Sequence, residues 1–184
     1  MGKIVLIIAP ERFRDEELFV TREELVRAGH HTVIASTRKG DCPGSRGGTA
    51  RATELLADVD PEAYDAVVFV GGGGSKVYFD DPAAQALARA MHKRRKVVAA
   101  ICLAPVILAN AGVLKGKKAT VAGTEAKAIE AGGAEYMGPG VVVSGNVVTA
   151  NAPKASRLFG QKIHEVLASR AAGRTPASRG RRHA

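Results

Sequence analysis

Tryptophan is missing from this sequence, and all aromatic residues together make up only 4% of it. A core formed by these 184 residues must therefore consist mainly of valine, isoleucine, leucine and alanine. Cysteine is almost as scarce, because Cys42 and Cys102 are the only two. Two cysteines in unrelated contexts predict neither a disulfide framework nor a zinc site, and they suit a reducing compartment.

Long hydrophobic runs are also absent, and no segment approaches the length of a membrane-spanning helix. The apolar start, Ile4 to Pro10, is short and has no cleavage-type sequence, so it predicts a buried strand rather than a signal peptide. We therefore expect a soluble cytoplasmic protein with no membrane partner. Its length suits one domain with a proper core.

Acidic residues are fewer than basic ones, 18 against 27, which gives a formal net charge of +9. Five of these charges come from a segment that begins at Arg170 and contains no acidic residue. This segment also lacks the apolar residues needed to fold. We therefore expect a domain over residues 1–169 and a basic, disordered tail over residues 170–184. The tail is expected to bind polyanions only weakly and without specificity, since no aromatic stacking residues accompany it.

Strand-like and helix-like segments alternate along the chain. Apolar runs predict strands at Lys3–Ala9, His31–Ser36, Ala63–Val70, Val97–Ile101, Lys118–Ala122, Val141–Val143 and Val147–Thr149. Helical periodicity and end signals predict helices at Asp15–Ala28, Pro82–Lys93, Leu103–Ala111, Thr124–Ala131 and Pro153–Ser169. The glycine-rich segment Lys39–Thr53 is expected to be a loop, with room for a short hairpin. Such alternation indicates an α/β fold whose mostly parallel central sheet carries helices on both faces.

The most informative segment surrounds Cys102, where an apolar strand meets a helix without an intervening loop. Such a turn would lift the cysteine off the end of the sheet, as in a nucleophile elbow. A sulfur at the start of a helix would be favoured as thiolate by the helix dipole. The alternative is an ordinary buried cysteine in a core strand.

Two further features follow strand ends and are therefore expected at the same edge of the sheet as Cys102. Asp15, Glu16 and Glu17 open the first helix, where acids usually serve as caps, but one could turn inward and hydrogen-bond to Cys102. The run Gly71–Gly74 lacks the spacing of a phosphate or dinucleotide loop. Backbone N–H groups of Gly72 and Leu103 could instead stabilise an oxyanion, while Gly73 and Gly74 are interpreted as a flexible turn.

Several motifs together resemble the DJ-1/PfpI superfamily, whose members are related to class I glutamine amidotransferases. They are Phe13–Leu18, Ser45–Gly47, Val70–Gly72, Ala99–Pro105, Lys117–Thr120 and Gly145–Thr149. The resemblance implies a flavodoxin-like three-layer sandwich, a homodimer, a reactive cysteine at Cys102 and a pocket glutamate at Glu17. It also places oxyanion amides at Gly72 and Leu103, and basic residues that approach the cysteine across a dimer interface at Arg46 and Arg27.

The sequence departs from the protease-like members of that superfamily. Leu103 stands where they carry histidine, and their partner acid is replaced near Lys76. Ala122 stands where other relatives place a histidine on the following strand. No general base is therefore evident beside the sulfur, and a PfpI-like protease with a Cys-His-acid triad is not expected.

Two functional hypotheses use the same residues. In the first, Cys102 and Glu17 convert small reactive carbonyls such as methylglyoxal, or their adducts, in a glyoxalase- or deglycase-like reaction without metal or cofactor. In the second, Cys102 is the oxidisable thiol of a redox sensor or chaperone without catalysis. A nucleic-acid-associated protein that uses the tail, and a binding protein with an unreactive thiol, stay open as further classes. Cys42 is expected in an exposed loop, incidental unless it lies near enough to act as a resolving thiol.

Overall fold

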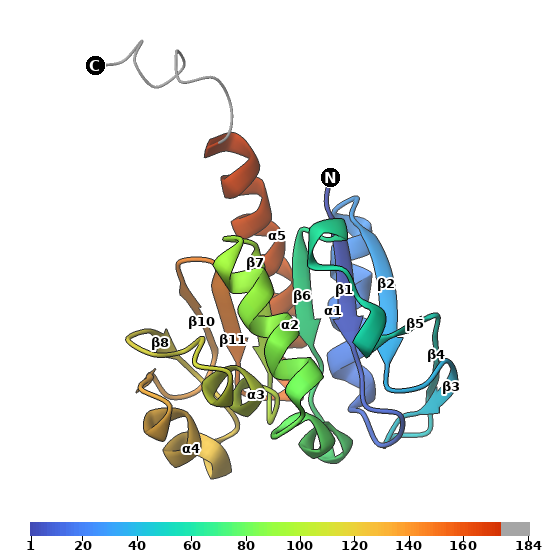
Figure 1. Ribbon diagram of the computed structural model, residues 1–184, viewed down its shortest axis with the longest axis horizontal. Coiled ribbons are helices and arrows are strands. Elements are labelled where there is room, and N and C mark those ends of the chain that lie inside the picture. The colour runs from blue at the N-terminus through green and yellow to red at the C-terminus, as the bar shows by residue number, and fades with distance from the viewer. Residues whose placement is uncertain (174–184) are drawn as a thin grey trace.

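Buried apolar strands form the central layer of the molecule (Figure 1). The computed structural model describes residues 1–173. Seven strands form the main sheet in the order β10-β11-β7-β6-β1-β2-β5, and only the edge pair β10–β11 is antiparallel. Their bounds are β1 Lys3–Ile7, β2 His31–Ser36, β5 Glu54–Leu55, β6 Ala66–Phe69, β7 Val97–Ile101, β10 Val141–Ser144 and β11 Val147–Ala150. The predicted mostly parallel sheet is confirmed.

Side chains of the central strands alternate between two hydrophobic clusters, one on each face of the sheet. In β1, Val5 and Ile7 pack into one cluster, whereas Ile4 and Leu6 pack into the other. All four are fully buried, which explains why the sequence of this strand is continuously apolar rather than alternating. Both faces are therefore covered, as the predicted three-layer sandwich requires.

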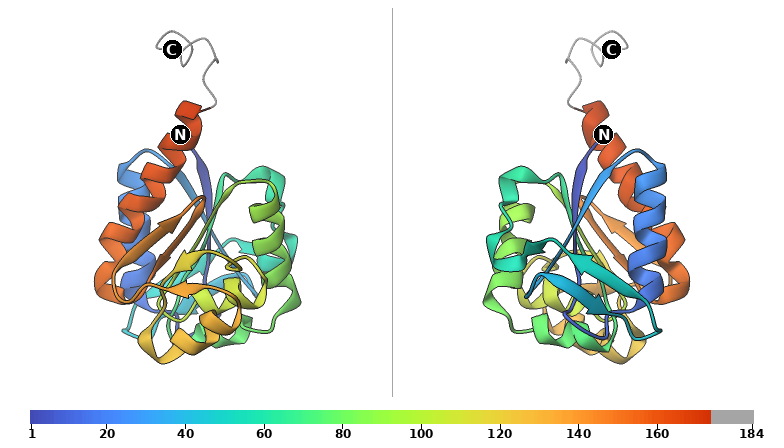
Figure 2. Two further views of the ribbon diagram at one scale, coloured as in Figure 1. Left: turned by 90° about the vertical axis from the view of Figure 1, so that its left-hand side faces the viewer. Right: turned by 90° about the vertical axis from the view of Figure 1, so that its right-hand side faces the viewer.

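Helices supply the two outer layers (Figure 2). One face carries α1 and α5, and the other carries α2 and α3. The first two pack closely, because Gly160 of α5 leaves space in which a Cβ atom would lie 2.8 Å from Cβ of Glu24 on α1. The helices are α1 Asp15–Arg27, α2 Pro82–Lys93, α3 Pro105–Asn110, α4 Ala126–Ala131 and α5 Ser156–Gly173.

Some elements differ from the sequence-based expectation. The segment Lys39–Thr53, where the sequence left room for a short hairpin, does contain one, formed by β3 Gly40–Pro43 and β4 Thr49–Ala52. The strand expected at Lys118–Ala122 is only β8 Lys118–Ala119, which pairs with β9 Glu135–Tyr136 outside the central sheet. Short 3-10 helices, which the sequence did not predict, occur at Leu56–Asp58, Pro61–Ala63, Gly73–Tyr78, Gly123–Glu125 and Pro153–Ala155.

The last helix is longer than predicted. It continues four residues beyond Ser169, so Arg170–Gly173 are helical and do not belong to an unfolded tail. The expected disorder of the rest of the tail, 174–184, lies outside the described residues. Within residues 1–173, no helix combines the length and apolar composition needed to cross a membrane.

Two histidines fasten α5 to the turn between α1 and β2. Nε2 of His30 lies 2.9 Å from Nδ1 of His164, and Nδ1 of His30 accepts a 2.9 Å hydrogen bond from the backbone N–H of Gly2. This cluster lies at the amino ends of the parallel strands, where the N-terminus and the end of α5 are found in Figure 1. The opposite edge, at the carboxyl ends, is therefore the one where a site is expected in a parallel sheet.

Gly74 and Gly73 provide a matched test of the packing at this opposite edge. A Cβ atom on Gly74 would lie 1.9 Å from the backbone oxygen of Glu11, whereas one on Gly73 would meet no atom within 4 Å. Backbone cannot yield as a flexible side chain does, so Gly74→Ala is expected to lower the free energy of unfolding by about 3 kcal/mol. Gly73→Ala should change it by less than about 0.5 kcal/mol.

Urea unfolding followed by circular dichroism measures both changes. Equal stabilities for the two variants would show that Gly74 does belong to a flexible turn, as the sequence alone indicated.

Candidate active site

Cys102 follows the last residue of β7 and has a left-handed backbone conformation, with φ of 64°. Residues with a side chain rarely adopt this conformation, so surrounding bonds must hold it. The N–H of Cys102 donates to the Ala150 oxygen at 2.8 Å, and the Cys102 oxygen accepts from the N–H of Ala122 at 2.7 Å. The side chain is partly exposed. The backbone at this position thus has the sharp bend of a nucleophile elbow.

The helix after the elbow begins later than predicted. It starts at Pro105 rather than Leu103, with Ala104 as its N-cap, and is only six residues long. Proline fits the first turn because it lacks the N–H that would be unpaired there. A short helix that begins three residues after the sulfur gives Cys102 less electrostatic support than the sequence analysis assumed.

Asp15 and Glu17 at the start of α1 are both buried, but of the three acids there only Glu17 is bonded to Gly71 beside the elbow. Glu17 is fully buried, and its Oε1 accepts a 2.9 Å hydrogen bond from the N–H of Gly71. Oε2 has no hydrogen-bond partner among the described residues. Asp15 instead accepts from the backbone N–H groups of Arg46 and Gly48, at 3.0 and 2.7 Å. Glu16 forms an ion pair with Arg14.

Gly71 brings the acid and the elbow together because it has no side chain. A Cβ atom there would lie 2.5 Å from Oε1 of Glu17, 2.6 Å from the Ile101 oxygen and 3.0 Å from Cβ of Cys102. No other residue type could occupy this position without displacing one of the three. The carboxyl group and the thiol are consequently close enough for each to shift the pKa of the other.

Burial dominates the electrostatics of this pair. It raises the pKa of Glu17 from its ordinary value to about 8, against the opposing effects of Cys102, the Gly71 N–H and the charge of Arg14. The pKa of the Cys102 thiol is raised to about 12, first by burial and then by the charge and hydrogen-bonding capacity of Glu17. Near neutral pH the resting pair therefore holds both protons. The expectation of a thiol with a depressed pKa was wrong, because desolvation outweighs the N–H of Leu103 and the charge of Arg14.

Arg14 is a member of the site that the sequence analysis did not single out. Its charge lowers the pKa of both Glu17 and Cys102, and its guanidinium is held by Glu16 through bonds of 2.9 and 3.0 Å. Its backbone N–H also donates to the Gly71 oxygen. The signal available in the sequence was its spacing, since Arg14 precedes Glu17 by three residues in the same helical turn.

The remaining predicted site residues lie in different places. The Leu103 N–H contributes to lowering the pKa of Cys102, so it lies against the sulfur. Gly72, with φ of 97°, packs its backbone against the Phe13–Arg14 peptide. Arg46 is near Glu16, whose pKa its charge helps to lower, whereas Arg27 pairs with Glu23 and Glu24 at the other end of α1. Oxyanion roles for Gly72 and Leu103, and cross-dimer roles for the two arginines, stay predictions.

No imidazole stands beside the sulfur among the described residues. His30 and His31 lie at the start of β2, His92 is near the end of α2, and His164 is bonded to His30. All four are at the amino ends of the strands, one strand length away from the elbow. Ala122, which is bonded to the Cys102 backbone, has no side-chain base, and Lys76 is exposed on the 3-10 helix after β6. His183 lies outside the described residues.

Cys42 is not in an exposed loop, which corrects the sequence-based expectation. It is a fully buried residue of β3 in the hydrophobic cluster that contains Phe13 and Leu18, and it forms no disulfide. Its thiol donates to the Gly40 oxygen at 3.6 Å. The hairpin alternation buries every second residue of the strand, which the local sequence Gly-Asp-Cys-Pro did not reveal.

A hollow of about 530 Å³ lies beside Arg14, and neither Glu17 nor Cys102 lines it. Arg14 and Glu16 form one side of it, and Ala152 and Pro153, just after β11, form another. Among the described residues, no group of three or more histidine, cysteine, aspartate or glutamate side chains is arranged to hold a metal ion. The chemical groups that the site offers are thus one thiol, one buried carboxyl and one guanidinium.

The sequence of this chain is similar to those of known proteins. The model of the DJ-1/PfpI family matches residues 2–166. The chain belongs to the DJ-1/PfpI family. An uncharacterized protein from Methanocaldococcus jannaschii is 44% identical over 169 residues, which cover 90% of this chain and 82% of that protein. A protein named as a deglycase from Thermococcus kodakarensis is 36% identical over 149 residues, which cover 81% of this chain and 90% of that one.

Solved structures of the DJ-1/PfpI family share the fold. A ThiJ/PfpI domain protein from Brachyspira murdochii superposes with a TM-score of 0.89 and 37% identity, over 91% of this chain and 96% of the other. The resemblance noted in the sequence, and the flavodoxin-like architecture that it implied, are confirmed.

Glu17 is expected to make the stability of the protein depend on pH. Its pKa rises from 4.5 to about 8 on folding, so the folded chain retains a proton that the unfolded chain loses. The contribution of Glu17 to the free energy of unfolding is thus fully present below pH 4.5 and is lost as the pH rises toward 8. Glu17→Gln removes this loss. The free energy of unfolding of the variant, minus that of the wild type, should therefore increase by about 3 kcal/mol from pH 5 to pH 8.

Glu16→Gln is the matched control, because the bond with Arg14 lowers the pKa of Glu16 to about 2 and leaves it ionised across this range. Urea denaturation at both pH values gives the four differences. A pH-independent difference between Glu17→Gln and wild type would contradict a protonated Glu17.

Proposed function

We propose that this DJ-1/PfpI protein is a cysteine-dependent enzyme that acts on small reactive carbonyls such as methylglyoxal, or on their adducts. Cys102 is the nucleophile in this proposal, and Glu17 transfers the proton. The observation that carries it is a buried carboxyl with a pKa near 8 facing a thiol on a strained elbow. Archaeal relatives named as deglycases support the same class of reaction.

Removal of one proton from the pair creates the reactive state. In the resulting monoanion, the remaining proton lies either on sulfur or on Glu17, and the two arrangements interconvert along the contact between them. As sulfur attacks the aldehyde carbon, the proton moves to the carboxylate, so the thiolate need not exist at rest. Glu17 is then a general base whose pKa is close to neutral pH, where this kind of catalysis is efficient.

The atoms balance through a hemithioacetal. The C–S bond forms as the aldehyde π bond breaks, and Glu17 returns its proton to the new alkoxide oxygen. Ionised again, Glu17 removes the hydrogen from the carbon attached to sulfur, and the electron pair passes to the neighbouring ketone. The former ketone oxygen takes up a proton, and reprotonation then occurs at the former ketone carbon while the hydroxyl beside sulfur loses its proton. The product is a thioester of lactate, which water cleaves to lactate and the free thiol. No external oxidant or cofactor is needed, because one carbon is oxidised as its neighbour is reduced.

Three groups around the sulfur are suited to stabilise the negative oxygen formed in the first step. The N–H of Leu103 already lies against the thiol, and Arg14 places a positive charge close to it. The Gly72 N–H has no acceptor among the described residues and is the second donor in this proposal. Preorganised donors of this kind are worth roughly 3 kcal/mol each in acyl-transfer enzymes.

The proposal also includes an oligomeric state and a cellular compartment. A homodimer would bring Arg27 or Arg46 of a second protomer toward the hollow beside Arg14. Two free cysteines fit a reducing cytoplasm. A PfpI-like protease is not supported, because every described histidine lies at the other end of the strands.

A redox sensor or chaperone is the second candidate, and one feature favours it. Oε2 of Glu17 is buried and unpaired among the described residues, so a protonated Glu17 could donate a hydrogen bond to an oxygen of an oxidised Cys102. Stepwise oxidation of the sulfur to sulfenic and sulfinic acid would need a peroxide as oxidant.

Turnover of methylglyoxal separates these candidates. Lactate formation should be lost in Cys102→Ser, and Glu17→Gln should reduce kcat/KM by at least about 100-fold, the usual contribution of a general base. In the wild type, kcat/KM should rise with pH and level off above about 8, following the pKa of Glu17.

Cys42→Ala is the control, and it should retain turnover because the Cys42 thiol donates to the Gly40 oxygen and has no bond to Cys102. If peroxide converts Cys102 stoichiometrically to sulfinate and neither the wild type nor any variant forms lactate, the redox-sensor hypothesis is favoured over the enzyme hypothesis.

A further inference from the structure

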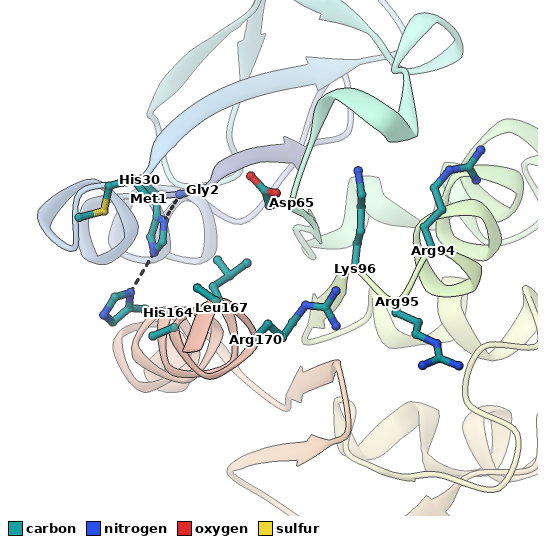
Figure 3. Close-up of a pocket in the computed structure, with 12 residues that line it drawn as sticks. Met1, Gly2, His30, Asp65, Arg94, Arg95, Lys96, His164, Leu167 and Arg170 are labelled. Carbon is teal, nitrogen blue, oxygen red and sulfur yellow. Dashed lines mark hydrogen bonds between the residues drawn. The ribbon is translucent and has the colours of Figure 1, made fainter. Parts of the chain in front are cut away.

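A cavity of about 660 Å³ opens at the amino ends of the strands, on the side away from Cys102 (Figure 3). The five residues of β7 lie between Lys96 at the cavity and Cys102, and these six residue steps of about 3.3 Å each span roughly 20 Å. Its volume lies in the range of small-molecule sites, about 300–1,000 Å³. Apolar surface comes from Leu167, Ala168 and Ala171 of α5, and the loop after α2 supplies charge. Nothing in the proposed carbonyl chemistry uses this cavity.

Arg95, which lines the cavity, has a conformation that favours glycine. Its φ is 60°, and it occupies the position just after the end of α2. The Arg95 N–H donates to the His92 oxygen at 2.9 Å, and the Lys96 N–H donates to the Met91 oxygen at 3.0 Å. This bonding is a Schellman motif, in which the left-handed residue is usually glycine. An arginine in this place is strained. Within residues 1–173, the other two non-glycine residues with positive φ are Cys102, at the elbow, and Arg12, whose backbone lies against Gly72.

The guanidinium of Arg95 is also unpaired within residues 1–173. Its neighbours are not: Arg94 forms an ion pair with Glu62, and Nζ of Lys96 donates to the Pro61 oxygen at 2.7 Å. Two cations of this basic loop are therefore used to hold the fold, and Arg95 is left with its charge available at the cavity wall.

Arg95 and Arg170 together separate this cavity from a second hollow of about 680 Å³, because both residues line both spaces. Figure 3 shows the Arg170 side chain extending from α5 toward the loop that holds Lys96. Asp65 is the acidic residue in the first cavity, and its Oδ2 already accepts a 2.8 Å bond from the Lys3 N–H. Burial and the charge of His164 lower the pKa of His30, which keeps that wall neutral. Positive charge thus dominates beside an apolar surface.

We propose that this cavity binds a small anion attached to an apolar body, such as a phosphate monoester or an aryl carboxylate. Arg95 binds the anionic group, and the apolar side chains of α5 cover the rest of the molecule. Guanidinium groups suit both kinds of anion, because their paired N–H donors match two oxygens of either.

Phenyl phosphate is a suitable test compound, with inorganic phosphate and phenol as its two halves. Isothermal titration calorimetry on the full chain should give a dissociation constant for phenyl phosphate of about 0.1–1 mM, as expected for a ligand of this size. Each half alone should bind at least about tenfold more weakly. Benzoate in place of phenyl phosphate distinguishes the two kinds of anion, and binding of either one supports the proposal.

Arg95→Gly is the decisive variant, because glycine suits the left-handed position. Its thermal midpoint should stay equal to that of wild type or rise by a few degrees, while the affinity for phenyl phosphate falls at least about tenfold. Lys93→Gln removes one charge from the same helix end without touching the cavity and should keep the wild-type affinity within about twofold.

Cys102→Ala should also keep this affinity, since the site is independent of the elbow. Any of four results would overturn the proposal: no binding of phenyl phosphate or benzoate, equal binding of inorganic phosphate, unchanged affinity in Arg95→Gly, or loss of affinity in Cys102→Ala. Tight binding of a polyanion such as heparin without binding of phenyl phosphate would assign the surface to a macromolecule instead.

Discussion

The missing side chain of Gly71 is the constraint on which the candidate active site depends. A methyl group at Gly71 would collide with a carboxyl oxygen of Glu17, the last carbonyl of β7 and Cβ of Cys102. Three segments distant in the sequence meet there: the first turn of α1, the end of β6 and the elbow. The Gly71 N–H then fixes one oxygen of the acid and leaves the other unpaired among the described residues. The Gly71 peptide thus fixes the position of the acid, whereas burial raises its pKa.

Desolvation, rather than a helix dipole, governs the chemistry of this pair. A buried carboxyl keeps its proton to about pH 8, and its charge, once formed, opposes ionisation of the neighbouring thiol. The two groups consequently behave as one acid with a shared proton. The charge of Arg14 lowers the pKa of both groups only in part, because its guanidinium is already bonded to Glu16. Such an arrangement keeps sulfur protected at rest and available once a single proton has gone.

Local signals in the sequence were sufficient for most of the framework. The bounds of α2 were predicted correctly because Asp81 caps it and Pro82 begins it, and those of β7 because its apolar run ends at the elbow. Contacts between distant segments were not accessible in this way. The burial of Cys42 and the pairing of β8 with β9 both depend on tertiary packing. Glu17 was distinguished from its two acidic neighbours by resemblance to a family, and no local rule would have chosen it.

The bond from Gly2 to His30 has a consequence for a ring far along the chain. A backbone N–H can only donate, so Nδ1 of His30 must carry a lone pair and its hydrogen must reside on Nε2. That hydrogen faces Nδ1 of His164, which must therefore be an acceptor, and the second ring is left with its hydrogen on Nε2. The backbone N–H of Gly2 thus determines the tautomer of both imidazoles. Through them it also determines the direction of any proton transfer between the two rings across the α1–α5 layer.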